Sequence, residues 1–262
     1  VLVDHASDEQ QSLDYFSSLT NSNQVLRFDG AFNFSGINNY AVSQLDPSYE
    51  SILFLNNDIE AIREGWLESM RDKLLRHDVG IVGAVLLYPD DSIQHAGVVL
   101  GIGIADHYLK GEAYPDPYIL RQTSNNIPLV VTRDFSAVTA ACLLIKKDLF
   151  DAIGGFDEKF AVGFGDVELC LKVRQQGRKV ICDGEAVLIH HESVSRDVET
   201  PYDPHPTDTA EFRFRYEHYV GSQDGLTMSN TDPFYNALLS TGGYYRPVRG
   251  VVRGHFVTPQ LT

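Results

Sequence analysis

The sequence predicts an α/β fold in which a mostly parallel central sheet is flanked by helices. Apolar runs that suit buried strands, such as 51–55 and 79–87, alternate with segments whose apolar residues recur at helical spacing. Polar side chains follow several of these runs directly, at the place where open α/β sheets bind their ligands. With 262 residues, 43% of them hydrophobic, the chain fits one large core with an appendage. We expect the core over residues 1–200 and a C-terminal linker, helix and tail over 201–262.

Up to residue 87, strand-like and helix-like segments alternate. In order, we expect a strand end at 1–4, a helix over 9–19, a strand over 25–28, a helix that ends before Pro47, a strand over 51–55, a helix over 59–76 and a strand over 79–87. The helix over 59–76 places Trp66, Met70 and Leu74 on one apolar stripe.

After residue 90 the alternation weakens and then resumes. Residues 94–101 fit a strand, and residues 110–126, rich in Pro, Tyr and Asn, fit a long surface loop. The regular elements that follow are a strand over 138–145, a short helix over 147–153, a helix over 166–176, strands over 179–182 and 186–189, and a helix-like stretch over 211–219.

Charge and cysteine content exclude several classes of partner and chemistry. A formal net charge of −15 argues against binding nucleic acid or an anionic membrane through the overall field. If the ligand is an anionic diphosphate, a bound divalent cation is the economical source of local positive charge. Cys142, Cys170 and Cys182 lie among apolar residues without zinc-type spacing, which predicts reduced core thiols. No apolar run is long enough to cross a bilayer.

Three polar clusters lie at expected strand ends or at an expected helix start. They are Asn56-Asn57-Asp58, residues 164–170 and residues 189–193. Each has a structural interpretation by itself, because Asn and Asp dominate turns and an Asp at a helix start is commonly a cap. Paired histidines are more often surface or hydrogen-bonded residues than ligands. The clusters gain meaning only when they are taken together.

Eight short stretches in fixed order carry a resemblance to a known family. They are Phe34-Ser-Gly-Ile-Asn-Asn39, Leu53-Phe-Leu-Asn-Asn-Asp58, Gly83-Ala-Val-Leu-Leu-Tyr88, Ile93-Gln-His-Ala-Gly-Val98, Thr139-Ala-Ala-Cys142, Gly154-Gly-Phe-Asp-Glu158, Gly165-Asp-Val-Glu-Leu-Cys170 and His190-His-Glu-Ser-Val-Ser-Arg196. Together they resemble glycosyltransferase family 2 with the GT-A fold, in particular its bacterial rhamnosyltransferase-like subgroup. The match runs from residue 1 to about 196, and Asp232-Pro-Phe-Tyr-Asn236 extends it into the tail.

The resemblance implies an inverting glycosyltransferase of polysaccharide biosynthesis. It would transfer a hexosyl or deoxyhexosyl group from a nucleotide-diphosphate sugar to a hydroxyl of a glycan or lipid-linked acceptor, with Mg²⁺ or Mn²⁺ as cofactor. We expect a cytoplasmic protein that meets the inner membrane only through its acceptor. Two alternatives stay open: an inactive or fragmentary nucleotide-sugar-binding relative, and a sugar nucleotidyltransferase, although the Gly-rich basic loop of the latter is not visible.

The resemblance also assigns the catalytic base. Asp166 matches the acidic motif of the family and would take the proton of the acceptor hydroxyl as the new bond forms. The alternative is that Asp166 only caps its helix, and Gly165 stands where relatives usually carry another acid. Glu168 is a secondary candidate, expected to pair with Lys172 one helical turn along.

Donor and metal binding are expected from the residues after the strand over 51–55. Asp58 matches the last Asp of the Asp-x-Asp-type motif and is the predicted metal ligand against the diphosphate. Asn57 replaces the middle Asp of many relatives, which leaves strict metal dependence open. Asn56 contacts ribose or metal, or else only makes hydrogen bonds to groups at the end of the strand.

The remaining candidates come from other positions of the family match. His190 is the preferred second metal ligand, and His191 is secondary. His95 lies either at the substrate cleft or buried with its hydrogen bonds satisfied, and Arg196 is a candidate phosphate contact. Asp4 matches the position that accepts a hydrogen bond from the nucleotide base, which makes it a donor-binding candidate.

Family members carry one more strand and helix before the strand that contains Asp4. A sheet without that central strand would expose unpaired backbone groups, a state that proteins avoid. We therefore expect this sequence, which begins with Val1, to be part of a longer reading frame.

Overall fold

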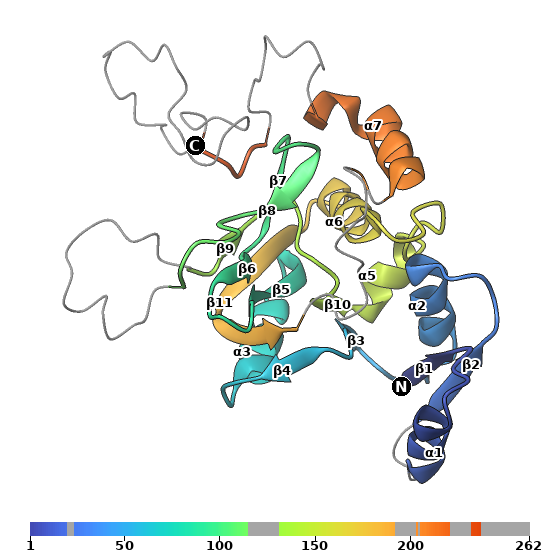
Figure 1. The fold of residues 1–262 in the computed structure, drawn as a ribbon. Helices are drawn as coiled ribbons and strands as arrows, with labels where there is room; N and C mark the ends of the chain where they lie inside the picture. Colours follow the sequence, from blue (N-terminus) through green and yellow to red (C-terminus); the bar gives the residue numbers. More distant parts are fainter. Residues whose placement is uncertain (20–23, 115–130, 192–202, 204, 221–231, 237–262) are drawn as a thin grey trace, which may run out of the picture.

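A seven-stranded sheet forms the centre of the molecule (Figure 1). The computed structural model describes residues 1–19, 24–114, 131–191, 203, 205–220 and 232–236. The main strands lie in the order β3-β10-β5-β11-β4, with β6 paired to β5 and β9 paired to β11. Their bounds are β3 (Ser51–Leu55), β4 (Ile59–Ala61), β5 (Val79–Leu87), β6 (Ile93–His95), β9 (Arg133–Asp134), β10 (Cys142–Lys146) and β11 (Lys179–His190).

The predicted α/β class is confirmed, and the directions of the strands explain where the site lies. Strand β10 is antiparallel to both β3 and β5, and β11 is parallel to β5. Strands β3, β5 and β11 therefore run in one direction, while β4, β6, β9 and β10 run against them. The carboxyl ends of β3, β5 and β11 consequently face the same edge of the sheet.

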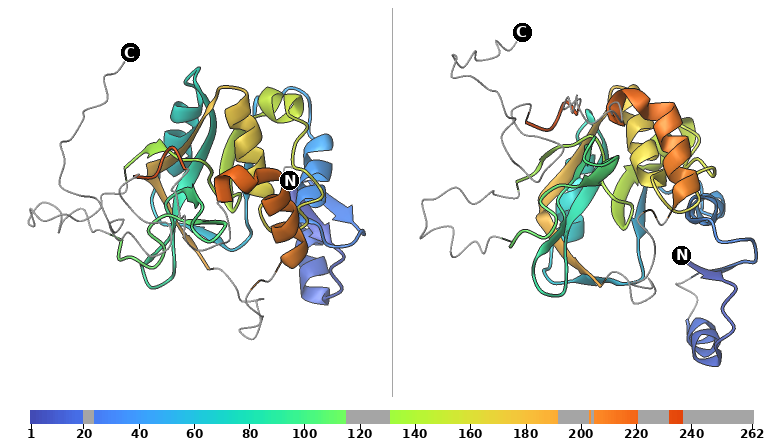
Figure 2. Two further views of the ribbon diagram at one scale, coloured as in Figure 1. Left: turned by 90° about the horizontal axis from the view of Figure 1, so that it is seen from above. Right: turned by 45° about the horizontal axis from the view of Figure 1, so that its top comes forward.

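Helices cover both faces of this sheet (Figures 1 and 2). Strand β5 is buried along its whole length, because alternate residues enter two separate cores. On one face Val82 and Leu86 pack with Met70 and Leu74 of α3 (Trp66–Leu74), as the predicted apolar stripe requires. On the other face the core is shared with α2 (Phe34–Ser43), α5 (Lys147–Ala152) and α6 (Gly165–Gln175).

Two small sheets lie outside the central one. Strand β1 (Leu2–His5) pairs in parallel with β2 (Val25–Phe28), and together with α1 (Gln10–Ser18) they stand to one side of the molecule (Figures 1 and 2). Strands β7 (Val98–Leu100) and β8 (Ala105–His107) form an antiparallel pair. The expected elements at 1–4, 9–19 and 25–28 are thus present, but β1 and β2 form a separate sheet instead of joining the expected central one.

The C-terminal helix α7 (Pro206–Val220) packs on the start of α6. The Phe212 side chain is fully buried and stacks on Phe164, with ring centroids 4.9 Å apart. The carboxylate of Asp208 accepts hydrogen bonds from the backbone N–H groups of Val162 and Gly163, at 2.9 and 2.7 Å. These contacts tie α7 to the core, while the predicted boundary between 1–200 and 201–262 stays a prediction.

The 232–236 segment, which extends the family match, is also anchored to the core. Asp232 is buried, and its carboxylate accepts the backbone N–H of Leu100 at 2.7 Å. Arg133 donates to the carbonyl of Phe234 at 2.8 Å, and the guanidinium carbon of Arg174 lies 3.8 Å from the centre of the Phe234 ring. The segment therefore packs against β7 and β9.

Two predicted elements have clearly different bounds in the structure. The helix expected over 59–76 begins only at Trp66, after Gly65 at φ 80°, because residues 59–61 pair with β11 as β4. The strand expected over 94–101 is divided into β6 and β7 at Gly97, whose φ is 113°. A side chain at Gly97 would collide with the Phe135 ring, since an added Cβ would lie 2.4 Å from it.

Two further boundaries differ by less. The strands expected over 179–182 and 186–189 are one strand, β11, with a register shift between Asp183 and Val187. The strand expected over 138–145 is β10, which begins at Cys142. Most of the expected loop over 110–126 lies outside the described residues.

None of the described helices combines the length and the apolar character that a bilayer-spanning segment needs. All three cysteines are buried and unpaired, in agreement with the predicted core thiols. Burial raises the pKa of the Cys142 thiol to about 12, which makes it a poor nucleophile.

Candidate active site

The structure brings the turn after β3 next to the end of β11. Strand β4 pairs with β11 so that Ile59 lies opposite His190, which places Asp58 beside that histidine. The Asp58 Oδ1 atom is 3.0 Å from His190 Nε2. The backbone N–H of His191 donates to the Asp58 carbonyl, also at 3.0 Å. The predicted pair of Asp58 and His190 is therefore in direct contact.

Both ring nitrogens of His190 have close neighbours. Nδ1 lies 2.6 Å from the side-chain oxygen Oε1 of Gln94, and Nε2 lies 3.3 Å from Asn56 Nδ2 as well as 3.0 Å from Asp58. His190 and Gln94 are both buried, whereas 36% of the Asp58 side chain is exposed. Asp58 is thus the solvent-facing member of the group.

Asp58 Oδ1 is an inaccessible oxygen without a hydrogen bond. Its distance to His190 is short, yet the relative orientation of the two groups does not form a hydrogen bond, so the atom has no hydrogen-bond partner among the described residues. An oxygen of this kind normally finds a donor or a cation, because burial of an unsatisfied polar atom costs about 1–3 kcal/mol. No cluster of three or more His, Cys, Asp and Glu side chains with a metal-binding arrangement occurs in the described part of the chain.

Asp166 is the second residue of α6 and sits one residue inside the helix rather than at its cap. Its Oδ2 atom accepts the backbone N–H of Ala140 at 3.1 Å, and Oδ1 accepts that of Val167 at 2.8 Å. The preceding Phe164 is the N-cap and has a left-handed backbone with φ 63°, a conformation that its stacking on Phe212 helps to hold. Two backbone donors therefore fix the orientation of the Asp166 carboxylate.

A short segment before β10 connects Asp166 to the turn after β3. Ala140 donates to Asp166, and the carbonyl of the adjacent Ala141 accepts the backbone N–H of Asn56 at 2.9 Å. Thr139, one residue earlier, donates its backbone N–H to His95 Nε2 at 3.4 Å. The predicted base and the predicted donor-binding turn are thus both hydrogen-bonded to this segment, which we call the 139–141 framework.

His95 lies inside this framework and not at an open cleft. It is fully buried, and its Nδ1 atom is 2.7 Å from Nδ1 of His107. Burial, with His107 and His190 nearby, holds the pKa of His95 well below its usual value. The neutral ring therefore donates one hydrogen bond and accepts another. Of the two interpretations of His95, the structure agrees with the buried, hydrogen-bonded one.

The side chains of Glu168 and His191 pair with residues other than Asp58 and His190. Glu168 is buried on α6, 3.2 Å from Lys172 Nζ, which is the expected pairing. Burial raises the pKa of Glu168, although the Lys172 ammonium opposes this. His191 is more exposed and lies 2.8 Å from Glu60 Oε2. Asn57 is exposed at the turn.

Asp4 belongs to the separate β1-β2 sheet. It accepts the backbone N–H of Ser7 at 3.0 Å and pairs with Arg27 at 2.6 Å. Hydrogen bonds from Ser7, together with the Arg27 guanidinium, lower the pKa of Asp4 to about 2. The donor-binding role of Asp4 stays a prediction. Arg196 lies outside the described residues.

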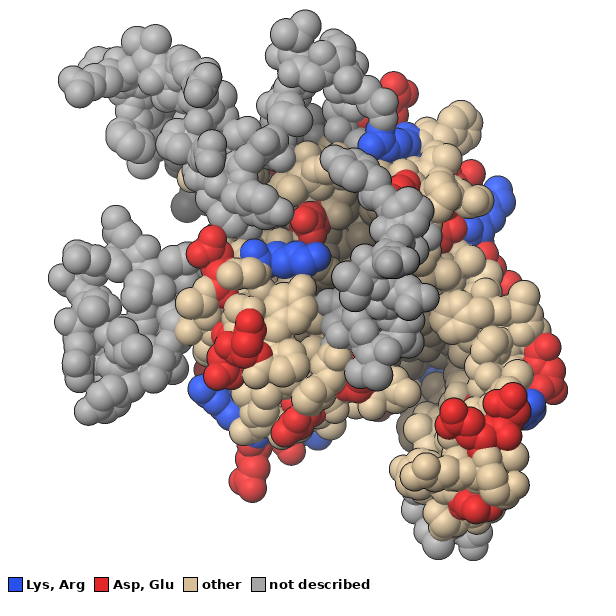
Figure 3. Space-filling model, in the orientation of Figure 1, with Lys and Arg blue, Asp and Glu red and all other residues tan. Residues whose placement is uncertain are grey.

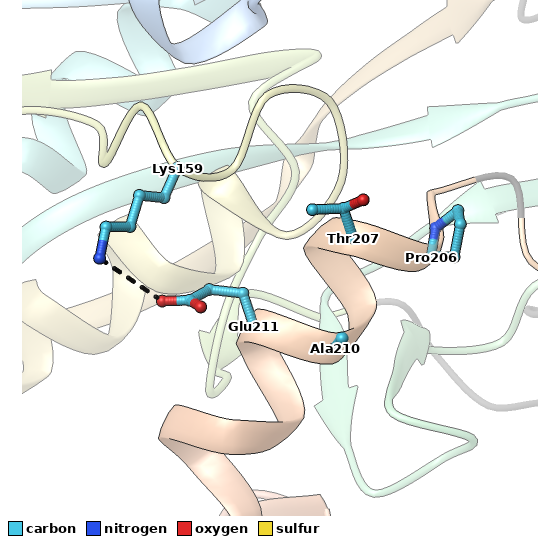
Figure 4. Close-up of a pocket in the computed structure, with 5 residues that line it drawn as sticks. All are labelled: Lys159, Pro206, Thr207, Ala210 and Glu211. Atoms are coloured by element: carbon cyan, nitrogen blue, oxygen red, sulfur yellow. Dashed lines mark ion pairs between the residues drawn. The ribbon is translucent and has the colours of Figure 1, made fainter.

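Acidic side chains are spread over the face shown in Figure 3, in keeping with the net charge of −15. A shallow hollow of about 680 Å³ lies elsewhere, against α7 (Figure 4). Lys159 and Glu211 face each other across it, with Nζ and Oε1 3.9 Å apart. Among the predicted site residues that the structure describes, none lines this hollow.

Sequence reasoning missed Gln94, the buried residue that contacts His190. The residue lies inside the quoted stretch Ile93-Gln-His-Ala-Gly-Val98, so a signal was present. A glutamine buried in a strand needs a hydrogen-bond partner, and that need points to a polar site nearby.

No protein-family model matches the sequence. The chain is 40% identical over 248 residues to the uncharacterized protein y4gI of Sinorhizobium fredii, covering 92% of the chain and 25% of that protein. It is 41% identical over 173 residues to the O-antigen biosynthesis protein RfbC of Myxococcus xanthus, covering 65% of the chain and 13% of that protein. The chain thus spans a quarter or less of the length of these relatives.

Two solved structures share the fold. The structure of GalNAc-T7 with UDP, GalNAc and Mn²⁺ superposes with a TM-score of 0.54 at 14% identity, covering 72% of this chain and 37% of that one. The mannosyltransferase PcManGT from Pyrobaculum calidifontis, in complex with GDP-Man and Mn²⁺, gives a TM-score of 0.50 at 16% identity, with coverage of 82% and 59%.

Proposed function

We propose that this chain, which has the GT-A glycosyltransferase fold, is the donor-binding and catalytic part of a glycosyltransferase of polysaccharide biosynthesis. It takes a nucleotide-diphosphate sugar as donor and a hydroxyl of a glycan or lipid-linked molecule as acceptor, and transfer proceeds with inversion. The identity to an O-antigen biosynthesis protein supports the pathway class. The complexes of the two structural neighbours with nucleotides, sugars and Mn²⁺ support the donor class and the cation.

The observation that carries the proposal is the pair formed by Asp58 Oδ1 and His190 Nε2. Two ligand atoms that hold one divalent cation at about 2.1 Å and at right angles lie about 3.0 Å apart, which is the distance found between these atoms. The inaccessible oxygen that lacks a hydrogen bond would gain its partner in the cation. The residues present therefore fit a divalent metal ion held by Asp58 and His190, with the donor diphosphate as its other ligand.

When bound, the cation supplies positive charge against the diphosphate and offsets the negative charge that grows on the departing nucleotide. The protein itself has little positive charge to offer, with a net charge of −15. Asn56 lies beside His190 Nε2 and presents an amide to the same space. Asn57 is exposed at the turn; in this proposal it contacts the donor and supplies no carboxylate. The site thus holds one carboxylate and one imidazole for the metal.

The Asp166 carboxylate acts as the general base. Its two backbone hydrogen bonds orient it, and each oxygen keeps a second lone pair for the proton of the acceptor hydroxyl. In the transfer, the acceptor oxygen bonds to the anomeric carbon, Asp166 takes the hydroxyl proton, and the bond from that carbon to the diphosphate oxygen breaks with its electron pair. Attack opposite the leaving group inverts the configuration at that carbon.

Thermal stability in the presence of nucleotide sugars tests this function. UDP-, GDP- and dTDP-sugars are added with Mn²⁺ or with a chelator, and a ligand at about 100 times its Kd stabilises the folded protein by about 2.7 kcal/mol. We expect at least one donor to raise Tm only when Mn²⁺ is present. Asp58→Asn should lose the rise, and Asp72→Asn, which changes an exposed aspartate on α3, should keep it.

Two results would contradict the proposal. No shift with any donor would favour an inactive relative over an enzyme. A donor shift of equal size in the chelator would show that Asp58 and His190 do not act through a cation.

A further inference from the structure

Gln94 is buried and contacts Nδ1 of His190, the ring nitrogen that is not next to Asp58. It is the middle residue of β6, which pairs with the end of β5, and it is 4% exposed. Its Oε1 atom lies 2.6 Å from His190 Nδ1. Nothing in the proposed transfer uses Gln94 directly, so its placement requires a separate explanation.

The chemistry of this contact determines where the imidazole of His190 carries its proton. An amide oxygen only accepts hydrogen bonds, so Nδ1 must carry the hydrogen that Gln94 receives. In a neutral ring Nε2 then carries a lone pair, toward which the Asn56 amide N–H donates at 3.3 Å, and this is also the atom 3.0 Å from Asp58 Oδ1. With the opposite tautomer, Nε2 would carry the hydrogen and have no lone pair for a cation.

We propose that Gln94 is a positioning residue that holds His190 in the Nδ1–H tautomer, with Nε2 available to the metal ion beside Asp58. This inference rests on the proposed function and adds to it the residue that makes His190 a ligand. Outer partners of metal-binding histidines commonly act in this way, and their loss typically lowers metal affinity about 10- to 100-fold.

The rival explanation is that Gln94 only supplies a hydrogen-bond partner to the buried His190 and supports packing. Both residues are buried, so any truncation of Gln94 affects stability in either case. Two variants separate the explanations. Gln94→Met keeps the side-chain length and removes the acceptor, whereas Gln94→Glu keeps an acceptor oxygen at the same place.

The test combines Mn²⁺ affinity with the tautomer of His190. Mn²⁺ binding without donor is followed by the EPR signal of the free ion, and the tautomer is read from ¹⁵N–¹H spectra of the metal-free protein at about pH 8, where an imidazole is ordinarily neutral. His190→Gln identifies the His190 signals by their disappearance. Gln176→Met changes an exposed glutamine and serves as the control.

We expect the wild type and Gln94→Glu to show the Nδ1–H tautomer and Mn²⁺ affinities within about threefold of each other. Gln94→Met should weaken Mn²⁺ binding about 10- to 100-fold and populate the Nε2–H tautomer. Unchanged affinity and tautomer in Gln94→Met would overturn the inference. Equal losses in the Met and Glu variants would also overturn it and indicate a packing role.

Failure of the proposed function can be distinguished from failure of the inference about Gln94. If the wild type binds no Mn²⁺, the metal site is wrong, and the tautomer spectra alone decide on Gln94. An Nδ1–H tautomer that Gln94→Met abolishes then still supports the positioning role, and any other pattern overturns it.

Discussion

Asp58 Oδ1 and His190 Nε2 lie 3.0 Å apart and do not form a hydrogen bond. The first atom belongs to the turn after β3, and the second ends β11, so the contact joins residues that are 132 positions apart in the chain. Pairing of β4 with β11 fixes it, because Ile59 lies opposite His190. Two electron-rich atoms at this distance with no hydrogen bond between them repel each other unless a nearby cation offsets their charge.

Removal of either partner should weaken Mn²⁺ binding, and removal of both should cost less than the product of the two losses. We expect Asp58→Asn and His190→Gln each to lose at least about tenfold in affinity, because both atoms are proposed to hold one ion. The free-ion EPR signal gives the affinities of the two single variants and the double variant. Fully multiplicative losses would indicate that the residues act independently.

Replacement of Asp166 should slow turnover and leave donor binding nearly intact. We expect Asp166→Asn to lower kcat about 10²- to 10⁴-fold, the usual contribution of a general base. An amide has only one acceptor oxygen, so the N–H of Ala140 or Val167 also loses its acceptor, at a cost of about 1 kcal/mol. Tm must therefore be measured alongside turnover. An enzyme that stays folded and turns over at the wild-type rate would exclude the base role.

The sequence was sufficient to predict the strand ends but not the pairings between distant strands. The expected strands at 25–28, 51–55 and 79–87 agree with β2, β3 and β5, because short segments dominated by apolar residues are a local signal. Residues 59–61 were expected to be helical, yet they form β4, because pairing with β11 is a long-range interaction that no local pattern records. The same pairing puts Asp58 next to His190.

The outer part of the site depended on register and was missed for that reason. Gln94 reaches His190 because β6 pairs with β5 across an irregularity between Leu86 and Leu87. The bridge from Ala140 and Ala141 to Asp166 and Asn56 consists of backbone groups, which carry no sequence signature. Side chains at strand ends can therefore be proposed from sequence, whereas the groups that orient them require the structure.

Phe212 is the fully buried ring that packs α7 on the core. Phe212→Ala should lower the free energy of unfolding by about 3–5 kcal/mol, since Phe212 is fully buried and packs on Phe160, Phe164 and Tyr216. Phe214→Ala, two residues along the same helix, is the matched control, because that ring is 84% exposed. Urea unfolding of both variants gives the comparison. Similar losses in the two variants would show that α7 is not packed as described.

The ion pair on α6, whose carboxylate is buried, should be far more sensitive than a pair of the same spacing whose carboxylate is half-exposed. Lys172→Met leaves the buried Glu168 without its cation and removes the hydrogen bond to the Gly155 carbonyl, at an expected cost of about 3 kcal/mol. Lys147→Met breaks an i,i+4 pair with the half-exposed Asp151, at about 0.5 kcal/mol or less. Equal effects in chemical denaturation would contradict the burial of Glu168.

Acidification should destabilise the protein through His95. Burial, with His107 and His190 nearby, depresses the pKa of His95 well below the 6.5 of an ordinary histidine. The unfolded chain therefore binds a proton below about pH 6.5 that the folded state does not bind, so the free energy of unfolding falls as the pH falls through this range. Above that pH both states are neutral, and the contribution of His95 is constant.

The variant His95→Gln stays neutral at every pH and should lose this dependence. Between about pH 8 and pH 5, we expect the wild type to lose more stability than His95→Gln, whatever the other titrating groups contribute to both. His77→Gln replaces an exposed histidine and should behave as the wild type does. Parallel stability curves for the wild type and His95→Gln would mean that His95 accepts its proton as readily in the folded protein as in the unfolded chain, contrary to its full burial.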